Sequence, residues 1–359
     1  EFTGRAKIIK MSDVPSKKAI GFISHGSGSA SFNFDADEKG EYVLTFVFHK
    51  SMAKKKQYMQ IHINDKMYEI FFPETKGFSP LGRQQIIVEL KEGTNNMTIK
   101  NPVATAIDSS YIQYKRMGNA LKEASSMWAK VTHSEEKPIT YSICEWGMAR
   151  PYLWGAKAGS MWRTTPDIAP NWRSITMIYN RTLKLYKHSG PGHWNDPDML
   201  EVGNGKLDDN ENRAHFSLWC MLAAPLMLGN DIRSFVSNGM PDKDNETLKI
   251  VTNKHMIAVD QDSLGKSAKR IKKESGIDII ARPLSNGDVA LCLFNTASST
   301  KSVNFKLDDL TKDPYLGIEE APSGYELHDL WTDERSTGTT INATIPKHST
   351  VVYRVKPTI

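Results

Sequence analysis

The hydrophobic pattern of this 359-residue chain changes its period twice, which divides the chain into three parts. Over residues 7–112 apolar and polar residues alternate in short runs between turn residues, as is typical of antiparallel strands. From Tyr114 the period is about 3.6 residues, and strands then alternate with helices, which predicts parallel β/α units. From about Lys266 the alternation of period two returns. We therefore predict a multi-domain fold: an N-terminal β-sandwich (1–112), half of a (β/α)8 TIM barrel (113–266) and a C-terminal antiparallel β-sandwich (267–359).

The individual elements follow from the same pattern and from turn residues such as Asn64-Asp65 and Glu92-Gly93. Strands of the first part are predicted at 29–36, 40–50, 58–65, 66–72, 83–93 and 95–101. A helix beginning at Tyr114 would place four apolar side chains on one face: Met117, Leu121, Ala124 and Trp128. Barrel strands are then predicted at 139–143, 162–165, 193–196 and 224–231, with helices at 172–187, 210–222 and 246–253.

Residues 138–200 concentrate five of the eight tryptophans together with several carboxylates, which indicates a sugar pocket. Flat apolar rings suit the C–H face of a pyranose, and carboxylates accept hydrogen bonds from hydroxyl groups or move protons. The residues are Trp146, Trp154, Trp162, Trp172 and Trp194, with Glu145, Asp167, Asp196 and Asp198. The alternative is that the rings belong to the core and the aspartates to turns and helix caps.

Composition excludes several other classes of function. The net charge of +5 is spread thinly, and its one basic run, Lys54, Lys55 and Lys56, is predicted to lie in a loop, so we do not expect a nucleic-acid partner. There is no apolar stretch long enough to span a membrane. Cys144, Cys220 and Cys292 lack paired spacing, which favours free thiols, and we expect no cofactor.

The segment EFTGRAKIIK has neither an initiating Met nor a signal-peptide pattern, which indicates an internal or processed start. This start therefore says nothing of localisation. We expect an extracellular or periplasmic protein.

Two parts of the chain resemble known families. The first resembles carbohydrate-binding modules of families 6 and 35 at GEYVLTF (40–46), at Ile63-Asn64-Asp65 and over 88–95, with Phe78 at the position of a common aromatic. A sandwich that binds no ligand fits this pattern equally well. At SICEWG, WRTTPDI, GHWNDPDML, APLMLGNDIR and AVDQDSLG, residues 114–359 resemble the carboxy-terminal half of glycoside hydrolase family 27, the α-galactosidase and α-N-acetylgalactosaminidase family.

The family resemblance implies roles for particular residues. Asp167 matches the general acid/base, and Arg163 matches an arginine that reaches the sugar hydroxyls. Glu145 matches the residue that meets the substituent on C2, its loop continues through Trp146, Gly147 and Met148, and Met199 matches an apolar contact beneath the ring. A retaining glycosidase pairs such an acid with a carboxylate nucleophile. An acid working near neutral pH needs apolar surroundings or an ionised partner, and Pro166 and Ile168 flank Asp167.

The implied substrate is a galactose-containing oligosaccharide, polysaccharide or glycoconjugate with a terminal α-linked galactose. Glu145 favours galactose, because a carboxylate needs a free 2-hydroxyl donor and leaves little room for an acetamido group. An α-N-acetylgalactosaminidase or a β-L-arabinopyranosidase of the same family is the alternative, and a non-catalytic carbohydrate-binding protein is another. A metal enzyme using His193, Asp196 and Asp198 is a weaker hypothesis, because their spacing is not typical of ligands.

The family's nucleophile is an Asp in a KYD-type strand, and this chain has no such strand. Asp65 and Asp108 would be poor substitutes, since they are predicted to lie in the sandwich. Half a barrel also exposes unpaired strand edges. We therefore expect the N-terminal barrel half to exist, either in the same polypeptide or as an associated chain, with the sandwich inserted after its last strand. In some members, the Cys that corresponds to Cys144 forms a disulfide with a second Cys. Gly159 stands at that second position here, which implies that Cys144 is free.

Overall fold

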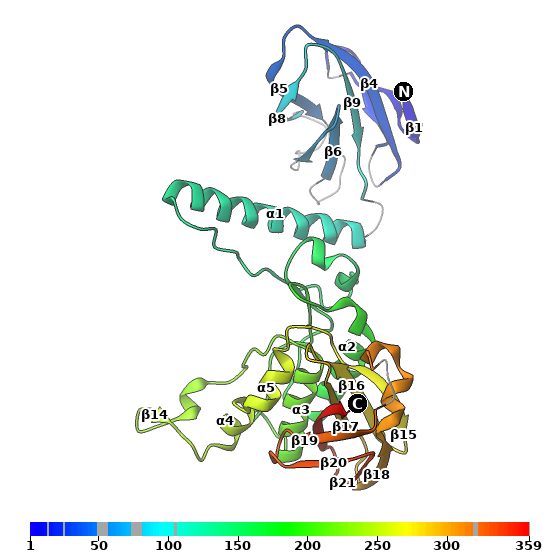
Figure 1. Cartoon of the computed structure of the whole chain (residues 1–359). Helices are drawn as coiled ribbons and strands as arrows, with labels where there is room; N and C mark the ends of the chain where they lie inside the picture. Colours follow the sequence, from blue (N-terminus) through cyan, green and yellow to red (C-terminus); the bar gives the residue numbers. More distant parts are fainter. Residues whose placement is uncertain are drawn as a thin grey trace. The chain divides into compact units, whose positions relative to one another are not determined.

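The computed structural model describes residues 1–12, 14–23, 26–48, 57–72, 81–103, 106–318 and 322–358 (Figure 1). These form two compact units, Glu1–Ile112 and Gln113–Ile359. The basic run Lys54, Lys55 and Lys56 and the aromatic Phe78 lie outside the described residues. Across the described part of the chain, every helix is too short or too polar to pass through a bilayer.

The first unit consists of antiparallel strands, and all six strands predicted there are confirmed. The strands are β1 (Phe2–Gly4), β2 (Lys7–Lys10), β3 (Lys18–Gly21), β4 (Gly28–Ala36), β5 (Gly40–Phe48), β6 (Gln57–Ile63), β7 (Lys66–Phe72), β8 (Gly82–Leu90) and β9 (Gly93–Lys100). They pair in the orders β1-β4-β9-β6-β7, β5-β8 and β2-β3. Side chains of β6 and β9 share one hydrophobic core with those of β5 and β8. The alternation at Tyr42, Leu44, Phe46 and Phe48 faces this core, as predicted.

Asn95 fixes the turn between β8 and β9 from inside the first unit. Its side chain is fully buried, and its Nδ2 donates to the carbonyl oxygens of Lys91 and Gly93, each at 2.8 Å. Its Oδ1 accepts from the Lys91 amide at 3.0 Å and from Asn64 Nδ2 at 2.9 Å. Asn64 lies in the β6–β7 turn, so one side chain ties two hairpins together.

We expect Asn95→Ala to lower the free energy of unfolding of the first unit by about 2 kcal/mol, because it removes a buried side chain that makes four hydrogen bonds. Every tryptophan of the chain lies after residue 112, so tryptophan fluorescence reports on the second unit alone. Urea unfolding of the whole chain should therefore shift when followed by far-UV circular dichroism and stay unchanged by tryptophan fluorescence. An equal shift in both signals would contradict this local role.

The helix α1 (Ala106–Thr132) begins earlier than predicted and buries a different face. Residues 106–112 are helical, so the placement of Asp108 in a strand was wrong. Met117 and Trp128 are 51% and 39% exposed, whereas Gly118 and Ala129 are buried. Gly118 is buried because the backbone approaches closely there: a Cβ on it would lie 1.9 Å from the Ala158 carbonyl oxygen. Of the four apolar residues predicted on one face, Met117, Ala124 and Trp128 are therefore exposed and Leu121 is half-buried.

After α1, the second unit contains three short parallel strands. They are β10 (Ser142–Ile143), β11 (Met161–Arg163) and β12 (Trp194–Asp196), with β11 in the middle. The fourth predicted strand, at 224–231, was wrong: only an isolated parallel bridge joins Leu200 to Leu228. Pro225 has no N–H to donate, and the Met227 amide turns back to the Pro225 carbonyl, so an extended ladder cannot form there.

Helices follow these strands much as the sequence predicts. The helical segments are η1 (Pro151–Leu153), η2 (Gly155–Lys157), α2 (Trp172–Thr182), η3 (Leu183–His188), α3 (Asp209–Met221), η4 (Ile232–Phe235), α4 (Glu246–Val251) and α5 (Lys254–Asp260), with a hairpin of β13 (Val236–Ser237) and β14 (Met240–Pro241). Asn171 caps α2, and Asp208 with Glu211 forms a capping box on α3. Helix α5 was not predicted; Asn253 caps it, since its Oδ1 accepts from two backbone amides.

The C-terminal part is built on an antiparallel sheet in which two strands are buried on both faces. Its strands are β15 (Lys269–Glu274), β16 (Ile277–Pro283), β17 (Val289–Asn295), β18 (Lys301–Lys306), β19 (Gly324–Asp329), β20 (Arg335–Gly338), β21 (Thr340–Ile345) and β22 (Thr350–Thr358), with η5 (Leu307–Lys312) and η6 (Pro314–Leu316). Six strands pair in the order β15-β16-β17-β22-β19-β20, and β18 pairs with β21. Cys292 and Phe294 of β17 join the core of α2, α3 and α5, whereas Leu291 and Leu293 join that of β18 and β21. Every residue of β16 and β17 is consequently buried.

Candidate functional site

The predicted site residues follow the carboxyl ends of the three parallel strands. Glu145, Trp146, Gly147 and Met148 come after β10, Arg163 ends β11, and Met199 follows β12. Because the strands are parallel and adjacent, these segments lie at one edge of the sheet. Asp167 lies just beyond β11 and is not a helix cap, since Asn171 caps the helix that follows.

Arg163 connects the two carboxylates of this edge. Its Nη2 lies 2.5 Å from Asp198 Oδ2 and 3.1 Å from Asp167 Oδ1. The side chains of Arg163 and Asp198 are 11% and 8% exposed, whereas that of Asp167 is 70% exposed. Arg163 and Asp198 therefore form a fixed, buried ion pair, and Asp167 extends from this pair into the open. The apolar surroundings that we expected around Asp167 are not provided by the described residues.

Asp198 is held by backbone groups as well as by Arg163. Its Oδ2 accepts from the Ile168 amide at 2.8 Å, and its Oδ1 accepts from the Met199 amide at 2.9 Å. Its own amide donates to Asp196 Oδ1 at 2.8 Å, and its φ of 84° is in the left-handed region. Burial raises the pKa of Asp196, which lies beneath this loop. These bonds fix the loop after β12 against the loop after β11.

The loop after β10 turns tightly beside β11. Trp146 and Gly147 have φ of 51° and 74°, and a Cβ on Gly147 would lie 2.1 Å from the Thr164 carbonyl oxygen. Only glycine fits this approach. The turn leaves Trp146 44% exposed, so its ring is available to a ligand. Tyr114 donates to the Cys144 carbonyl at 3.0 Å, and burial, with the nearby Glu145 charge, raises the pKa of the Tyr114 hydroxyl.

Most of the tryptophans expected to line a sugar pocket belong to the core instead. Trp154 and Trp162 are buried, and Trp162 Nε1 donates to Asn195 Oδ1 at 2.9 Å. Trp162 is buried because it lies on the central strand of the sheet. Trp172 stacks on His348 and packs against Phe294 of the C-terminal sheet. Of the five rings, Trp146 is the one with substantial exposure at a strand end.

The partner of Arg163 was missed by the sequence reasoning. Asp198 was grouped with the carboxylates that accept hydrogen bonds from hydroxyl groups or move protons, but its oxygens accept from Arg163 and from two backbone amides. The signal present in the sequence was an arginine ending one strand and a DPD segment ending the next. All three cysteines are free thiols, with Cys144 exposed.

The hydrogen bonds at the strand ends do not favour a metal site made of His193, Asp196 and Asp198. His193 Nδ1 lies 3.0 Å from the Pro191 carbonyl, and Asp196 and Asp198 use their oxygens within the loop. Among the residues that the structure describes, a different group brings metal-ligand atoms together, namely His255, His328 and Asp333.

Parallel strands with polar side chains at their carboxyl ends, alternating with helices, are the arrangement found in TIM-barrel enzymes, and the comparisons with known proteins support this class. Residues 104–262 match the family model for alpha galactosidase A, and residues 274–355 match that for the alpha galactosidase C-terminal beta sandwich domain. The chain therefore belongs to glycoside hydrolase family 27, the α-galactosidase family.

Comparisons with individual proteins of known sequence or structure support this family assignment. The chain is 37% identical over 254 residues to an alpha-galactosidase of Cyamopsis tetragonoloba, covering 69% of this chain and 58% of the relative. It is 35% identical to alpha-galactosidase A of Cellvibrio japonicus, covering 66% of this chain and 60% of the relative. The crystal structure of alpha-galactosidase I from Mortierella vinacea superposes with a TM-score of 0.61 at 26% identity, covering 72% of this chain and 66% of that one. The chain thus spans about three fifths of the length of these curated relatives.

Proposed function

We propose that this chain forms the acid/base half of a retaining α-galactosidase, with Asp167 as the group that moves the proton. The observation that carries the proposal is the position of Asp167, exposed at the end of β11 and held at 3.1 Å by a buried arginine. The names of the relatives support the substrate class. In the proposed reaction Asp167 protonates the glycosidic oxygen as the bond to the anomeric carbon breaks, and then takes a proton from the attacking water.

Arg163 is proposed to position this carboxyl group. It is fixed by Asp198, so its second ion pair holds Asp167 toward the open side of the sheet. Glu145 is proposed to accept a hydrogen bond from the 2-hydroxyl group, with Trp146, Gly147 and Met148 in the same loop. Met199, 41% exposed after β12, is proposed to contact the apolar face of the ring.

We further propose that a first barrel half completes this sheet and supplies the carboxylate nucleophile, either from the same polypeptide or from an associated chain. Among the described strands, β10 and β12 each pair on one side only. Apolar side chains are also exposed in the second unit: Met117 and Trp128 on α1, and Met227 and Leu228 after α3. Unpaired parallel edges and exposed apolar surface favour a covering segment. The resemblance to carbohydrate-binding modules supports a sugar-binding role for the first unit, inserted before α1.

The proposed substrate is a galactose-containing oligosaccharide, polysaccharide or glycoconjugate, encountered outside the cell or in the periplasm. A carboxylate at position 145 supports galactose over N-acetylgalactosamine, because the acetamido group needs more room than a hydroxyl group and has a different hydrogen-bonding pattern. An arabinopyranose has the same ring hydroxyls without C6, so its aryl β-L-glycoside is the essential comparison.

The test combines intact mass of the protein purified from its source with hydrolysis of p-nitrophenyl α-D-galactoside. We expect activity in the species that carries a complete barrel, with α-galactose as the first product by proton NMR, and slower hydrolysis of the α-N-acetylgalactosaminide and β-L-arabinopyranoside. First release of β-galactose would contradict retention. A complete species that binds galactose without cleaving any of the three glycosides would instead establish a carbohydrate-binding protein.

A further inference from the structure

Three potential metal ligands from separate segments of the second unit meet at the edge of the C-terminal sheet. His255 lies on α5, His328 on β19, and Asp333 in the turn between β19 and β20. Nε2 of His328 lies 2.6 Å from Asp333 Oδ1, and Nε2 of His255 lies 3.4 Å from the same oxygen. The two imidazole rings are 4.9 Å apart and nearly perpendicular. We propose that these three side chains bind a divalent transition-metal ion, with Zn²⁺ as the ion that best fits the ligands.

The chemistry of the three donors supports Zn²⁺. Two imidazole nitrogens and one carboxylate oxygen are a common set for this ion, which prefers tetrahedral coordination. With bonds of about 2.0–2.1 Å, neighbouring donors of a tetrahedron are roughly 3.3 Å apart. The separation of 3.4 Å between His255 and Asp333 matches this value. The contact between His328 and Asp333 is a hydrogen bond at 2.6 Å that the ion would replace, and Asp333, whose side chain is 65% exposed, is free to move.

The segments that carry the ligands are fixed to each other by other contacts. Asn253 Oδ1 accepts from the His255 amide at 3.0 Å, and its Nδ2 donates to the Leu330 carbonyl in the turn at 3.1 Å. Trp331 Nε1 of the same turn donates to Ser217 Oγ of α3 at 3.0 Å. The donors are therefore brought together by a framework that does not depend on the ion, which lowers the entropy cost of binding.

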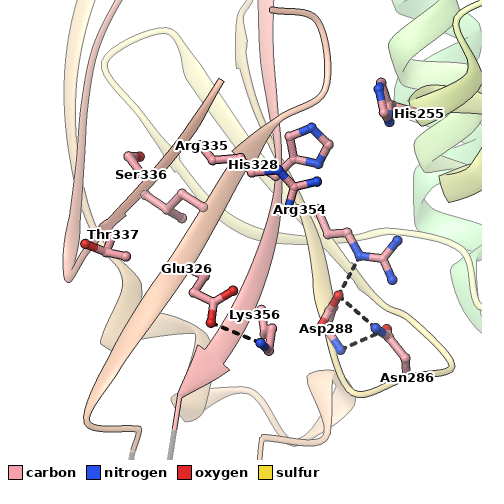
Figure 2. Close-up of a pocket in the computed structure, with 11 residues that line it drawn as sticks. His255, Asn286, Asp288, Glu326, His328, Arg335, Ser336, Thr337, Arg354 and Lys356 are labelled. Carbon is pink, nitrogen blue, oxygen red and sulfur yellow. Dashed lines mark hydrogen bonds and ion pairs between the residues drawn. The ribbon is translucent and has the colours of Figure 1, made fainter. Parts of the chain in front are cut away.

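Three protein ligands leave a fourth position, and this position opens on a groove. His255 and His328 line one end of a hollow of about 560 Å³, shown in Figure 2. Of the cations that line the hollow, Arg354 and Lys356 pair with Asp288 and Glu326, at 2.5 Å and 3.0 Å, and Arg335 also lines it. We take water as the fourth ligand. The ion would join helix α5 to the C-terminal sheet and stabilise the second unit, apart from the residues proposed for glycoside cleavage.

The experiment is a calorimetric titration of the chelator-treated whole chain with Zn²⁺ alone, together with its melting temperature with and without the ion. We expect one Zn²⁺ per chain and a rise in Tm. His255→Asn and Asp333→Asn should each weaken binding at least tenfold and abolish the rise, since each removes a ligand. The matched controls, His133→Asn and Asp244→Asn, remove one exposed histidine and one exposed aspartate elsewhere and should bind as the parent does.

Both ligand substitutions affect side chains that are partly exposed, so the variants should fold; circular dichroism checks this directly. Co²⁺ gives a second readout, because tetrahedral Co²⁺ absorbs strongly in the visible range, and the absorption should be lost in both ligand variants. The inference is overturned if the parent binds no Zn²⁺, or if the ligand variants bind it as tightly as the controls do. None of these outcomes depends on glycosidase activity, so the proposed function is tested separately.

Discussion

Replacing Asp167 by alanine should lower kcat/KM for α-galactosides with poor leaving groups by about 10²–10⁴-fold, the usual contribution of a general acid. Such substrates need a proton on the departing oxygen. Aryl α-galactosides with strongly acidic phenols do not, so cleavage of their glycosidic bond should be much less affected. The measurement is kcat/KM across a series of aryl leaving groups, in the active species with a complete barrel.

The fold should tolerate this substitution, because Asp167 is 70% exposed and Arg163 keeps its buried partner Asp198. Asp209→Ala, at an exposed aspartate in the first turn of α3, is the matched control and should leave activity unchanged. The role assigned to Asp167 would be wrong if its variant lost activity equally on good and poor leaving groups. The role would also be wrong if the variant cleaved every substrate as fast as the parent does.

Two buried groups should change the free energy of unfolding of the second unit with pH in opposite directions, so that their contributions cancel in the parent. Burial raises the pKa of Asp260 from 3.8 to about 7, although Gln261 and Arg282 oppose the shift. Burial lowers the pKa of His215 from 6.5 to about 3. Asp260 therefore stabilises the fold fully below about pH 3.8, and this stability is lost as the pH rises toward 7. The neutral His215 stabilises it above pH 6.5, and this stability is lost as the pH falls toward 3.

Single substitutions should separate the two contributions. Each group changes the free energy of unfolding by roughly 1.4 kcal/mol per pH unit within its window, or about 2 kcal/mol between pH 4.5 and 6. Relative to the parent, Asp260→Asn should become more stable as the pH rises through this range. His215→Gln, which keeps an acceptor for the Glu201 amide, should become less stable.

The measurement is urea unfolding followed by tryptophan fluorescence at several pH values, with each variant compared with the parent. The comparison removes the contribution of all other titrating groups. Parallel curves for the parent and both variants would show that neither buried group carries the expected shift.

The sequence predicted those features that depend on local pattern. Strands of the first unit were found at their predicted positions because alternation and turn residues such as Asn64 and Gly93 act over a few residues. The segments after the three parallel strands were located for the same reason. The local signal was weaker where Pro225 interrupts an apolar run, and the predicted strand there proved to be a single bridge.

Features set by distant partners could not be predicted. The exposed face of α1 depends on what packs against Gly118, forty residues before Ala158, and periodicity alone does not identify that partner. Trp162 and Trp146 are equally apolar in sequence, yet one lies on a central strand and the other on a turn. The pairing of Arg163 with Asp198 likewise requires two loops to be brought together by the sheet.

The burial of β16 and β17 on both faces bears on how this protein can be divided. The change of period near Lys266 marks a boundary in the sequence, but residues of α2, α3 and α5 share one core with Cys292 and Phe294 on the far side of it. The antiparallel sheet thus packs against the helices that follow the parallel strands. Separating the two at residue 266 would expose a continuous apolar surface on both products, so the helices behind the candidate site and the C-terminal sheet should fold and unfold as one cooperative body.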